Sequence, residues 1–329
     1  MFNRFLPKCC RPNNNDLHIE TILPVIDNNT IQTNKLDNST TSYIREEKDI
    51  DINTIIEMIE NNEYVRSFKC IKSYKRNTFG VFRYNQFIIR IDSTEYDVCR
   101  NEHSIMALLN ENKPIHIVLP YIVEHINERM VISIQPYIEN SITLDKWVDN
   151  NYDICRNHKL ILPIFIKLCK LLEYLHSRHI VHGDIKPTNI LIQSPLNEPY
   201  LIDFGMSGIA NKSPGTGGTN VFCHPATGNT KAHDDEYTWC ENKREHDIWS
   251  IGFIFLTIIL YKKCLQSIES IPPPLLTTDG YVDFSYIKSN GVITNMKLIE
   301  IFEYILHMTP SWRNMTDIIE QLEAHVKKL

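Results

Sequence analysis

The chain has 329 residues with 40 acidic and 34 basic side chains, which gives a formal net charge of −6. This mildly acidic balance argues against a dedicated nucleic-acid binder, which needs a concentrated basic surface. A hydrophobic content of 43% excludes a globally disordered chain, and the length suits two packed lobes or two domains.

The first 63 residues are polar, and we expect them to form a disordered or loosely attached tail. Asn, Thr, Asp and Ser dominate residues 1–48, and the few apolar residues there lack periodicity. Only residues 51–61 have the spacing of a short amphipathic helix. The adjacent Cys9 and Cys10 lie among basic residues and could accept a lipid, although an unmodified tail is the simpler interpretation.

Cysteine usage and hydropathy indicate the compartment. Nine cysteines, an odd number without a CxxC pair, favour reduced thiols over a disulfide framework or a zinc site. The most apolar run, residues 248–261, is too short to cross a bilayer and predicts a buried helix. We therefore expect an intracellular protein, cytoplasmic or nuclear, with neither a signal peptide nor a transmembrane segment.

Residues 64–137 form a strand-rich first lobe in this interpretation. Short aromatic or β-branched segments separated by polar turns predict strands. One helix is expected at residues 100–109. The expected strands are residues 65–74, 79–84, 86–92, 115–123 and 130–136.

Residues 138–329 form a mostly helical second lobe. Apolar residues at helical spacing recur along it, most strongly in residues 160–177. Further helices are expected at residues 248–261, 297–307 and 315–326. The predicted order is thus a sheet with one helix followed by a helical lobe.

Residues 180–208 hold the polar side chains that suggest chemistry. Asp184 and Lys186 lie two apart on a predicted loop, and Asn189 and Asp203 are hard-oxygen side chains suited to Mg²⁺. Two short apolar segments between the last two would form a hairpin that brings them to the same end. Phosphoryl transfer needs such a carboxylate, a cation and metal ligands in fixed places.

These residues make the chain similar to the eukaryotic-type serine/threonine protein kinase family. H-G-D-I-K-P-T-N stands where H-R-D-x-K-x-x-N is usual, and D-F-G follows. The resemblance covers about residues 64–329. It implies an α+β, bilobal fold, with a small antiparallel β-sheet lobe carrying one main helix and a larger, mostly helical lobe.

The resemblance also implies roles for these residues. Asp184 would be the catalytic base, and Lys186 would contact the transferred phosphate. Asn189 and Asp203 would hold Mg²⁺ or Mn²⁺ beside ATP. The implied partner is a protein with a Ser or Thr acceptor, a preference that Lys186 supports because tyrosine-directed members usually carry Ala or Arg in this loop.

Later segments extend the resemblance. Residues 218–225 resemble the substrate-binding segment, with Thr219 in the position typical of serine/threonine kinases. Asp247 begins D-I-W-S-I-G, which resembles the start of the central buried helix, and would accept hydrogen bonds from the catalytic-loop backbone. A plain helix N-cap is the alternative for Asp247. Arg313 matches the late arginine of the family.

The nucleotide half departs from the family pattern. The chain has 11 glycines, none before Gly80, and Gly80 alone remains of the phosphate-covering glycine loop. Arg90 stands where the phosphate-anchoring lysine is usual, which is not a conservative change. Glu102 matches the helix glutamate that pairs with this residue, either for function or as a structural salt bridge. Lys72 or Lys75 is the alternative source of an ammonium group.

The expected adenine pocket is crowded, because larger side chains replace smaller ones. Ile88 replaces a small Ala, Phe82 replaces a Val, and Leu191 matches the usual floor residue. The hinge falls at residues 134–136. The nucleotide-contacting set implied by the resemblance is Gly80, Phe82, Ile88, Arg90, Glu102, Ile134, Gln135 and Leu191, and Pro136 removes one backbone N–H beside it.

The second lobe departs at two positions. Gly183 replaces the arginine that usually receives the phosphate of an activation loop, so regulation without that switch is expected. Ala226 replaces the glutamate that usually pairs with the late arginine.

Two other functions remain open. Arg90 and the lone Gly80 would also suit a pseudokinase that acts as a scaffold or binding module. H-G-D followed by I-D-F-G also resembles small-molecule kinases of the aminoglycoside-phosphotransferase type. The compressed first lobe resembles kinases encoded by large DNA viruses, which would place the protein in a host cell.

Overall fold

The computed structural model describes two units of the chain, residues 1–64 and 65–329. The described residues are 52–61, 63–74, 79–93, 105, 108–109, 114–210, 222, 224–225, 244–261, 275–278, 280–291, 293, 295–307 and 314–329. Several predictions therefore lie outside the described residues: residues 1–51 of the tail with Cys9 and Cys10, most of the helix at 100–109, Lys75, Glu102, Thr219, Ala226 and Arg313.

The first unit contributes one described helix, α1 (Ile52–Glu60). Its buried residues Ile55 and Ile59 lie four apart and therefore on one face of the helix. The helix α2 (Tyr64–Ser67) follows at the boundary between the units.

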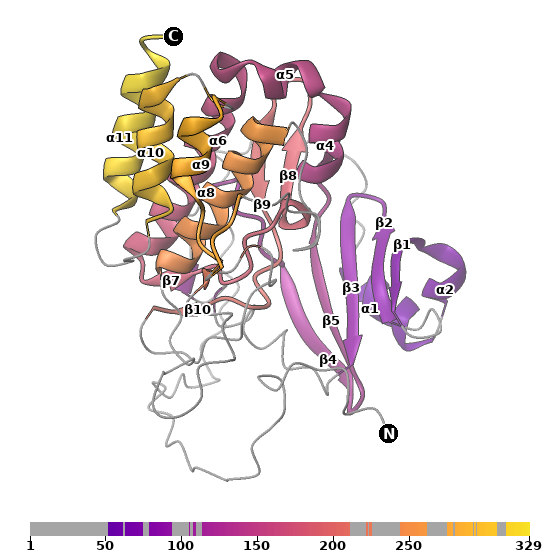
Figure 1. The fold of residues 1–329 in the computed structure, drawn as a ribbon. Coiled ribbons are helices and arrows are strands. Elements are labelled where there is room, and N and C mark those ends of the chain that lie inside the picture. Colours follow the sequence, from indigo (N-terminus) through magenta and orange to yellow (C-terminus); the bar gives the residue numbers. More distant parts are fainter. Residues whose placement is uncertain are drawn as a thin grey trace, which may run out of the picture. The chain divides into compact units, whose positions relative to one another are not determined.

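The second unit begins with a five-stranded antiparallel sheet in the order β1-β2-β3-β5-β4 (Figure 1). The strands are β1 (Lys69–Tyr74), β2 (Phe79–Tyr84), β3 (Phe87–Ser93), β4 (Ile122–Asn127) and β5 (Met130–Pro136). The predicted small antiparallel sheet is thus confirmed.

Strand β3 divides its side chains between the two faces of the sheet. Phe87, Ile89 and Ile91 are buried, whereas the alternate residues Ile88, Arg90 and Asp92 are partly exposed. This is the period of two that a pleated strand imposes. One face of β3 therefore supplies the hydrophobic core and the other carries the charged pair.

The segment before β4 differs from the predicted strand at residues 115–123. Pro120 cannot donate a hydrogen bond to a ladder, and β4 begins only at Ile122. Upstream of Pro120, the backbone forms hydrogen bonds with the second lobe instead. The Val118 N–H donates to the Leu201 carbonyl (2.9 Å), and the Leu201 N–H donates to the His116 carbonyl (2.8 Å).

Helices dominate the second lobe, as the sequence pattern predicts (Figure 1). They are α4 (Leu144–Asn150), α5 (Tyr152–Arg156), α6 (His158–Ser177), the 3₁₀ turn η3 (Pro187–Asn189), α8 (Arg244–Tyr261), α9 (Phe284–Ser289), α10 (Met296–Ile305) and α11 (Met315–Val326). The short strands between them are β6 (Ser141–Thr143), β7 (Ile180–Val181), β8 (Ile190–Gln193), β9 (Glu198–Leu201) and β10 (Gly208–Ile209).

Helix α8 forms the centre of this lobe. Every residue from 247 to 259 is buried, as expected for a helix that is packed on all sides. Phe165 of α6 stacks on Phe255 of α8 with ring centroids 4.4 Å apart. Gly252 allows α10 to approach, because a Cβ at this position would lie 2.3 Å from Ile305 Cγ2.

Among the described residues, no helix has the length and apolar content needed to cross a membrane.

Candidate active site

A hairpin brings the two predicted metal ligands to one end. β8 pairs with β9 in antiparallel register, with Ile190 opposite Leu201. Asn189 immediately precedes β8, and Asp203 lies two residues after β9. The Ile202 N–H donates to the Asn189 carbonyl (3.1 Å), which fixes the two ends beside each other.

Asp184 lies in a polar cluster on the loop between β7 and η3, and it is only 8% exposed. Its Oδ2 accepts hydrogen bonds from Lys186 Nζ (2.5 Å) and from Asn189 Nδ2 (3.1 Å). Asn189 Nδ2 also donates to the Asp184 carbonyl (2.9 Å). A carboxylate held by two donors in this way has a fixed direction, which a group that accepts a proton from a hydroxyl requires.

The donor set on the hairpin fits a hard divalent cation. Because the Asn189 amide nitrogen donates to Asp184, its Oδ1 points away from Asp184. The Asp203 carboxylate is 42% exposed. Amide and carboxylate oxygens of this kind are suitable ligands for Mg²⁺.

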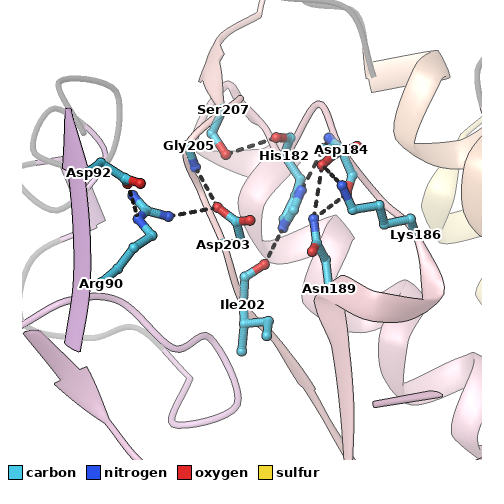
Figure 2. A network of polar contacts seen from close by, with 10 residues as sticks. All are labelled: Arg90, Asp92, His182, Asp184, Lys186, Asn189, Ile202, Asp203, Gly205 and Ser207. Atoms are coloured by element: carbon cyan, nitrogen blue, oxygen red, sulfur yellow. Dashed lines mark hydrogen bonds and ion pairs between the residues drawn. The ribbon is translucent and has the colours of Figure 1, made fainter. Parts of the chain in front are cut away.

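Asp203 itself has an uncommon backbone conformation. Its φ is +64°, in the left-handed region that few residues other than glycine adopt. Its Oδ1 lies 3.4 Å from the Gly205 N–H and accepts a weak local hydrogen bond. Such conformations concentrate at functional sites, and this one directs the carboxylate toward the sheet lobe (Figure 2).

Arg90 of β3 reaches the hairpin from the sheet lobe. Its Nη1 donates to Asp203 Oδ1 at 3.0 Å, and its Nε forms an ion pair with Asp92 Oδ2 at 2.8 Å, without the alignment of a hydrogen bond (Figure 2). The sequence predicted Glu102 as the partner of Arg90. The described partners are the carboxylates of Asp203 and Asp92.

Asp247 supports the catalytic loop from beneath, as the resemblance implies. Its Oδ2 accepts from the His182 N–H (2.8 Å) and its Oδ1 from the Gly183 N–H (2.9 Å). His176 Nε2 lies 2.9 Å from the same carboxylate. Burial opposes ionisation of Asp247, but the hydrogen bond and charge of His176, with the His182 and Gly183 contacts, hold its pKa below the usual value.

His182 links the two loops of the site. The Asp184 N–H donates to His182 Nδ1 (3.3 Å), so this ring nitrogen must be an acceptor. Nε2 therefore carries the proton and donates to the Ile202 carbonyl (3.1 Å). The Ser207 hydroxyl donates to the His182 carbonyl (2.9 Å), so the loops that hold Asp184 and Asp203 are joined on both sides of this residue.

The nucleotide residues expected from the sequence divide between two faces of the sheet. Ile88 and Gln135 are opposite each other and share the face of Arg90. Phe82 is opposite Ile89, so it lies on the buried face instead. Ile134 is also opposite Ile89 and lies on that buried face.

This differs from the predicted pocket lining at Phe82 and Ile134. A shift of one residue in strand register moves a side chain to the opposite face, and the sequence does not fix that register. Of the remaining predicted positions, Leu191 lies on β8 opposite Tyr200, and Gly80 lies on β2 opposite Ile91.

The register also places residues that sequence reasoning missed. Val81 and Ser133 are the direct neighbours of Arg90 on β2 and β5. Lys72 is opposite Val81 on β1, so this predicted alternative cation stands in the same row as Arg90. Asp92 was also missed, although the sequence could have indicated it, because a residue two positions from Arg90 in a strand must share its face.

This geometry defines a class of protein, and comparison with known families agrees. The chain belongs to the family of the protein kinase domain, whose model matches residues 63–322. The expected bilobal fold is confirmed, and the relatives of the chain include proteins named as serine/threonine kinases.

Individual relatives are distant. A protein of Acanthamoeba polyphaga mimivirus described as a serine/threonine-protein kinase is 32% identical over 182 residues, covering 52% of this chain and 60% of its own length. The MAP kinase kinase skh1/pek1 of Schizosaccharomyces pombe is 33% identical over 130 residues, covering 35% and 33%. The serine/threonine-protein kinase nekl-2 of Caenorhabditis elegans is 23% identical over 227 residues, covering 63% and 60%. The chain thus spans at most 60% of the length of these relatives.

Proposed function

We propose that this protein is an ATP-dependent serine/threonine protein kinase that transfers the γ-phosphoryl group to protein hydroxyls. The observation that carries the proposal is the buried Asp184, whose carboxylate is held by Lys186 and Asn189 beside the hairpin that bears Asp203. We assign the nucleotide lobe to residues 64–137 and the catalytic lobe to residues 138–329, with residues 1–63 as a tail.

In this mechanism the chain supplies positioning and charge. Asp184 accepts the proton of the acceptor hydroxyl, whose oxygen bonds to the γ-phosphorus as the bond from that phosphorus to the bridging oxygen of ADP breaks. Lys186, 25% exposed, offers a cation beside that carboxylate. Asn189 and Asp203 would hold Mg²⁺ or Mn²⁺, which neutralises phosphate charge when bound.

The test is transfer of label from radiolabelled ATP. With Mg²⁺ or Mn²⁺ and a generic protein substrate, we expect label on Ser and Thr, and Asp184→Asn should lower the rate at least 100-fold because the general base is lost. Asp153→Asn, an exposed carboxylate on α5, is the matched control and should transfer label at the wild-type rate. Equal transfer by wild type and Asp184→Asn would contradict the proposal.

A second candidate function is a pseudokinase scaffold. The observation that favours it is the contact of Arg90 with Asp203, because in a scaffold this ion pair would take the place of a metal at Asp203 instead of supporting nucleotide binding. A thermal-shift titration distinguishes the two: a scaffold with an occluded pocket would show no shift with Mg·ATP and no label transfer. Label on an aminoglycoside or choline panel, but not on protein, would instead indicate a small-molecule kinase.

A further inference from the structure

We propose that Asp92 is a positioning residue, which holds the guanidinium of Arg90 so that it reaches Asp203 and the nucleotide phosphates. The inference rests on the proposed function, because it assigns a role within the same site. The carboxylate in question is that of Asp92, which lies on the same strand as Arg90.

The first step is the geometry of the strand. Arg90 and Asp92 are two residues apart in β3, and their side chains therefore emerge from the same face. Their exposures are similar, at 15% for Arg90 and 18% for Asp92. The ion pair is thus formed within one rigid strand and largely screened from water, where opposite charges attract more strongly than at an exposed site.

The second step is the chemistry of the guanidinium. It is a planar group whose separate N–H donors have fixed directions. Arg90 contacts Asp92 through Nε and Asp203 through Nη1, so one side chain bridges two carboxylates (Figure 2). The attraction between the guanidinium at Nε and the Asp92 carboxylate keeps the group beside β3, while Nη1 donates to Asp203 of the second lobe.

The third step explains why arginine accompanies this aspartate. A lysine ammonium is a compact charge on a flexible stem, without two donors at a fixed separation. It cannot pair with Asp92 and Asp203 in the geometry that Arg90 uses. We therefore expect Arg90 and Asp92 to act as a matched pair, so that Arg90→Lys alone weakens the site although lysine is the residue usual in the family.

The test measures Mg·ATP affinity by calorimetric titration together with label transfer. Asp92→Ala should weaken Mg·ATP binding roughly tenfold, the usual effect of losing a charge-assisted contact. Asp92→Asn keeps the shape and one acceptor oxygen and should fall between wild type and Asp92→Ala. Glu124→Ala, an exposed carboxylate on β4 of the same sheet, is the control and should bind as wild type does.

The decisive comparison uses the Arg90→Ala background. If Asp92 acts through Arg90, adding Asp92→Ala to Arg90→Ala causes no further loss of affinity. An equal loss in both backgrounds would mean that Asp92 merely supports the strand and would overturn the inference. Wild-type affinity in Asp92→Ala, or affinity above wild type in Arg90→Lys, would also overturn it.

The proposed function and this inference can fail separately. Label transfer by wild type that is unaffected by Asp92→Ala and Asp92→Asn contradicts the inference alone. Mg·ATP affinity that depends on Asp92 as expected, without label transfer by wild type, contradicts the transferase function and supports the positioning role. If wild type binds no Mg·ATP, both are overturned.

Discussion

Among single residues, Gly183 shows how backbone conformation shapes the catalytic loop. Its φ is +80°, and its N–H donates to Asp247 while the preceding His182 N–H does the same. Glycine adopts this conformation without a Cβ clash. Gly183 therefore replaces the usual arginine of this loop and also lets the loop adopt a positive φ without strain.

This predicts a measurable cost for Gly183→Ala. A side chain in the left-handed region costs about 1 kcal/mol, so the free energy of unfolding in urea should fall by about that amount. Gly291→Ala is a matched control, since its φ is +60° and a Cβ would meet nothing within 4 Å. Both variants should lose similar stability, but only Gly183→Ala should slow label transfer. An unchanged transfer rate would show that the loop tolerates the strain.

Among the elements, the contact between α10 and α11 depends on a neutral histidine. Asn295 caps α10 by accepting from the Leu298 N–H (3.1 Å), and its Nδ2 lies 3.1 Å from His325 Nε2 of α11. The amide nitrogen can only donate, so Nε2 must accept and be unprotonated. Burial first, and then the charges of Lys328 and Lys297, lower the pKa of His325.

Acid should therefore weaken this contact. Because the pKa of His325 is lower in the folded state than its ordinary value near 6.5, its contribution to stability is complete above that pH and falls as the pH decreases below it. Urea denaturation should show that the free energy of unfolding falls less between pH 7.5 and pH 5.5 for His325→Gln than for wild type. His125→Gln, which alters an exposed histidine on β4, should behave as wild type. An equal decrease in the free energy of unfolding for wild type and His325→Gln would contradict the prediction.

At the scale of the whole molecule, Arg90 and Asp203 join the sheet lobe to the helical lobe, and both lobes supply the candidate nucleotide site. A ligand that binds only the folded protein stabilises it by mass action. Binding should therefore raise the stability of the folded chain rather than of one element.

We expect Mg·ATP to raise the unfolding temperature. At 100 times its dissociation constant, the gain in unfolding free energy is about 2.7 kcal/mol. Asp203→Asn should reduce this shift, because a metal ligand loses its charge, whereas Asp153→Asn should retain it. A full shift in Asp203→Asn would mean that Asp203 does not hold the metal.

The hairpin of the active site could be predicted because it is local. Two short apolar segments flanked by Asn189 and Asp203 leave few arrangements other than antiparallel pairing, which places both residues at one end. The role of Asp247 was predictable for a different reason, since it followed from the family motif. The segment before β4 was less predictable. Its apolar residues resemble a strand of the first sheet, but the residues before Pro120 form backbone hydrogen bonds with Leu201 of the second lobe.

The sequence by itself determined the strand-rich first lobe, the long helices of the second lobe, the family and the residues of the catalytic loop, because these depend on local spacing and motif. Only the tertiary structure decided which partners Arg90 meets and which face Phe82 and Ile134 occupy. Strand register and the approach of the two lobes depend on packing between segments far apart in the chain, and a shift of one residue reverses every side chain in a strand. That packing places Arg90 between Asp92 and Asp203.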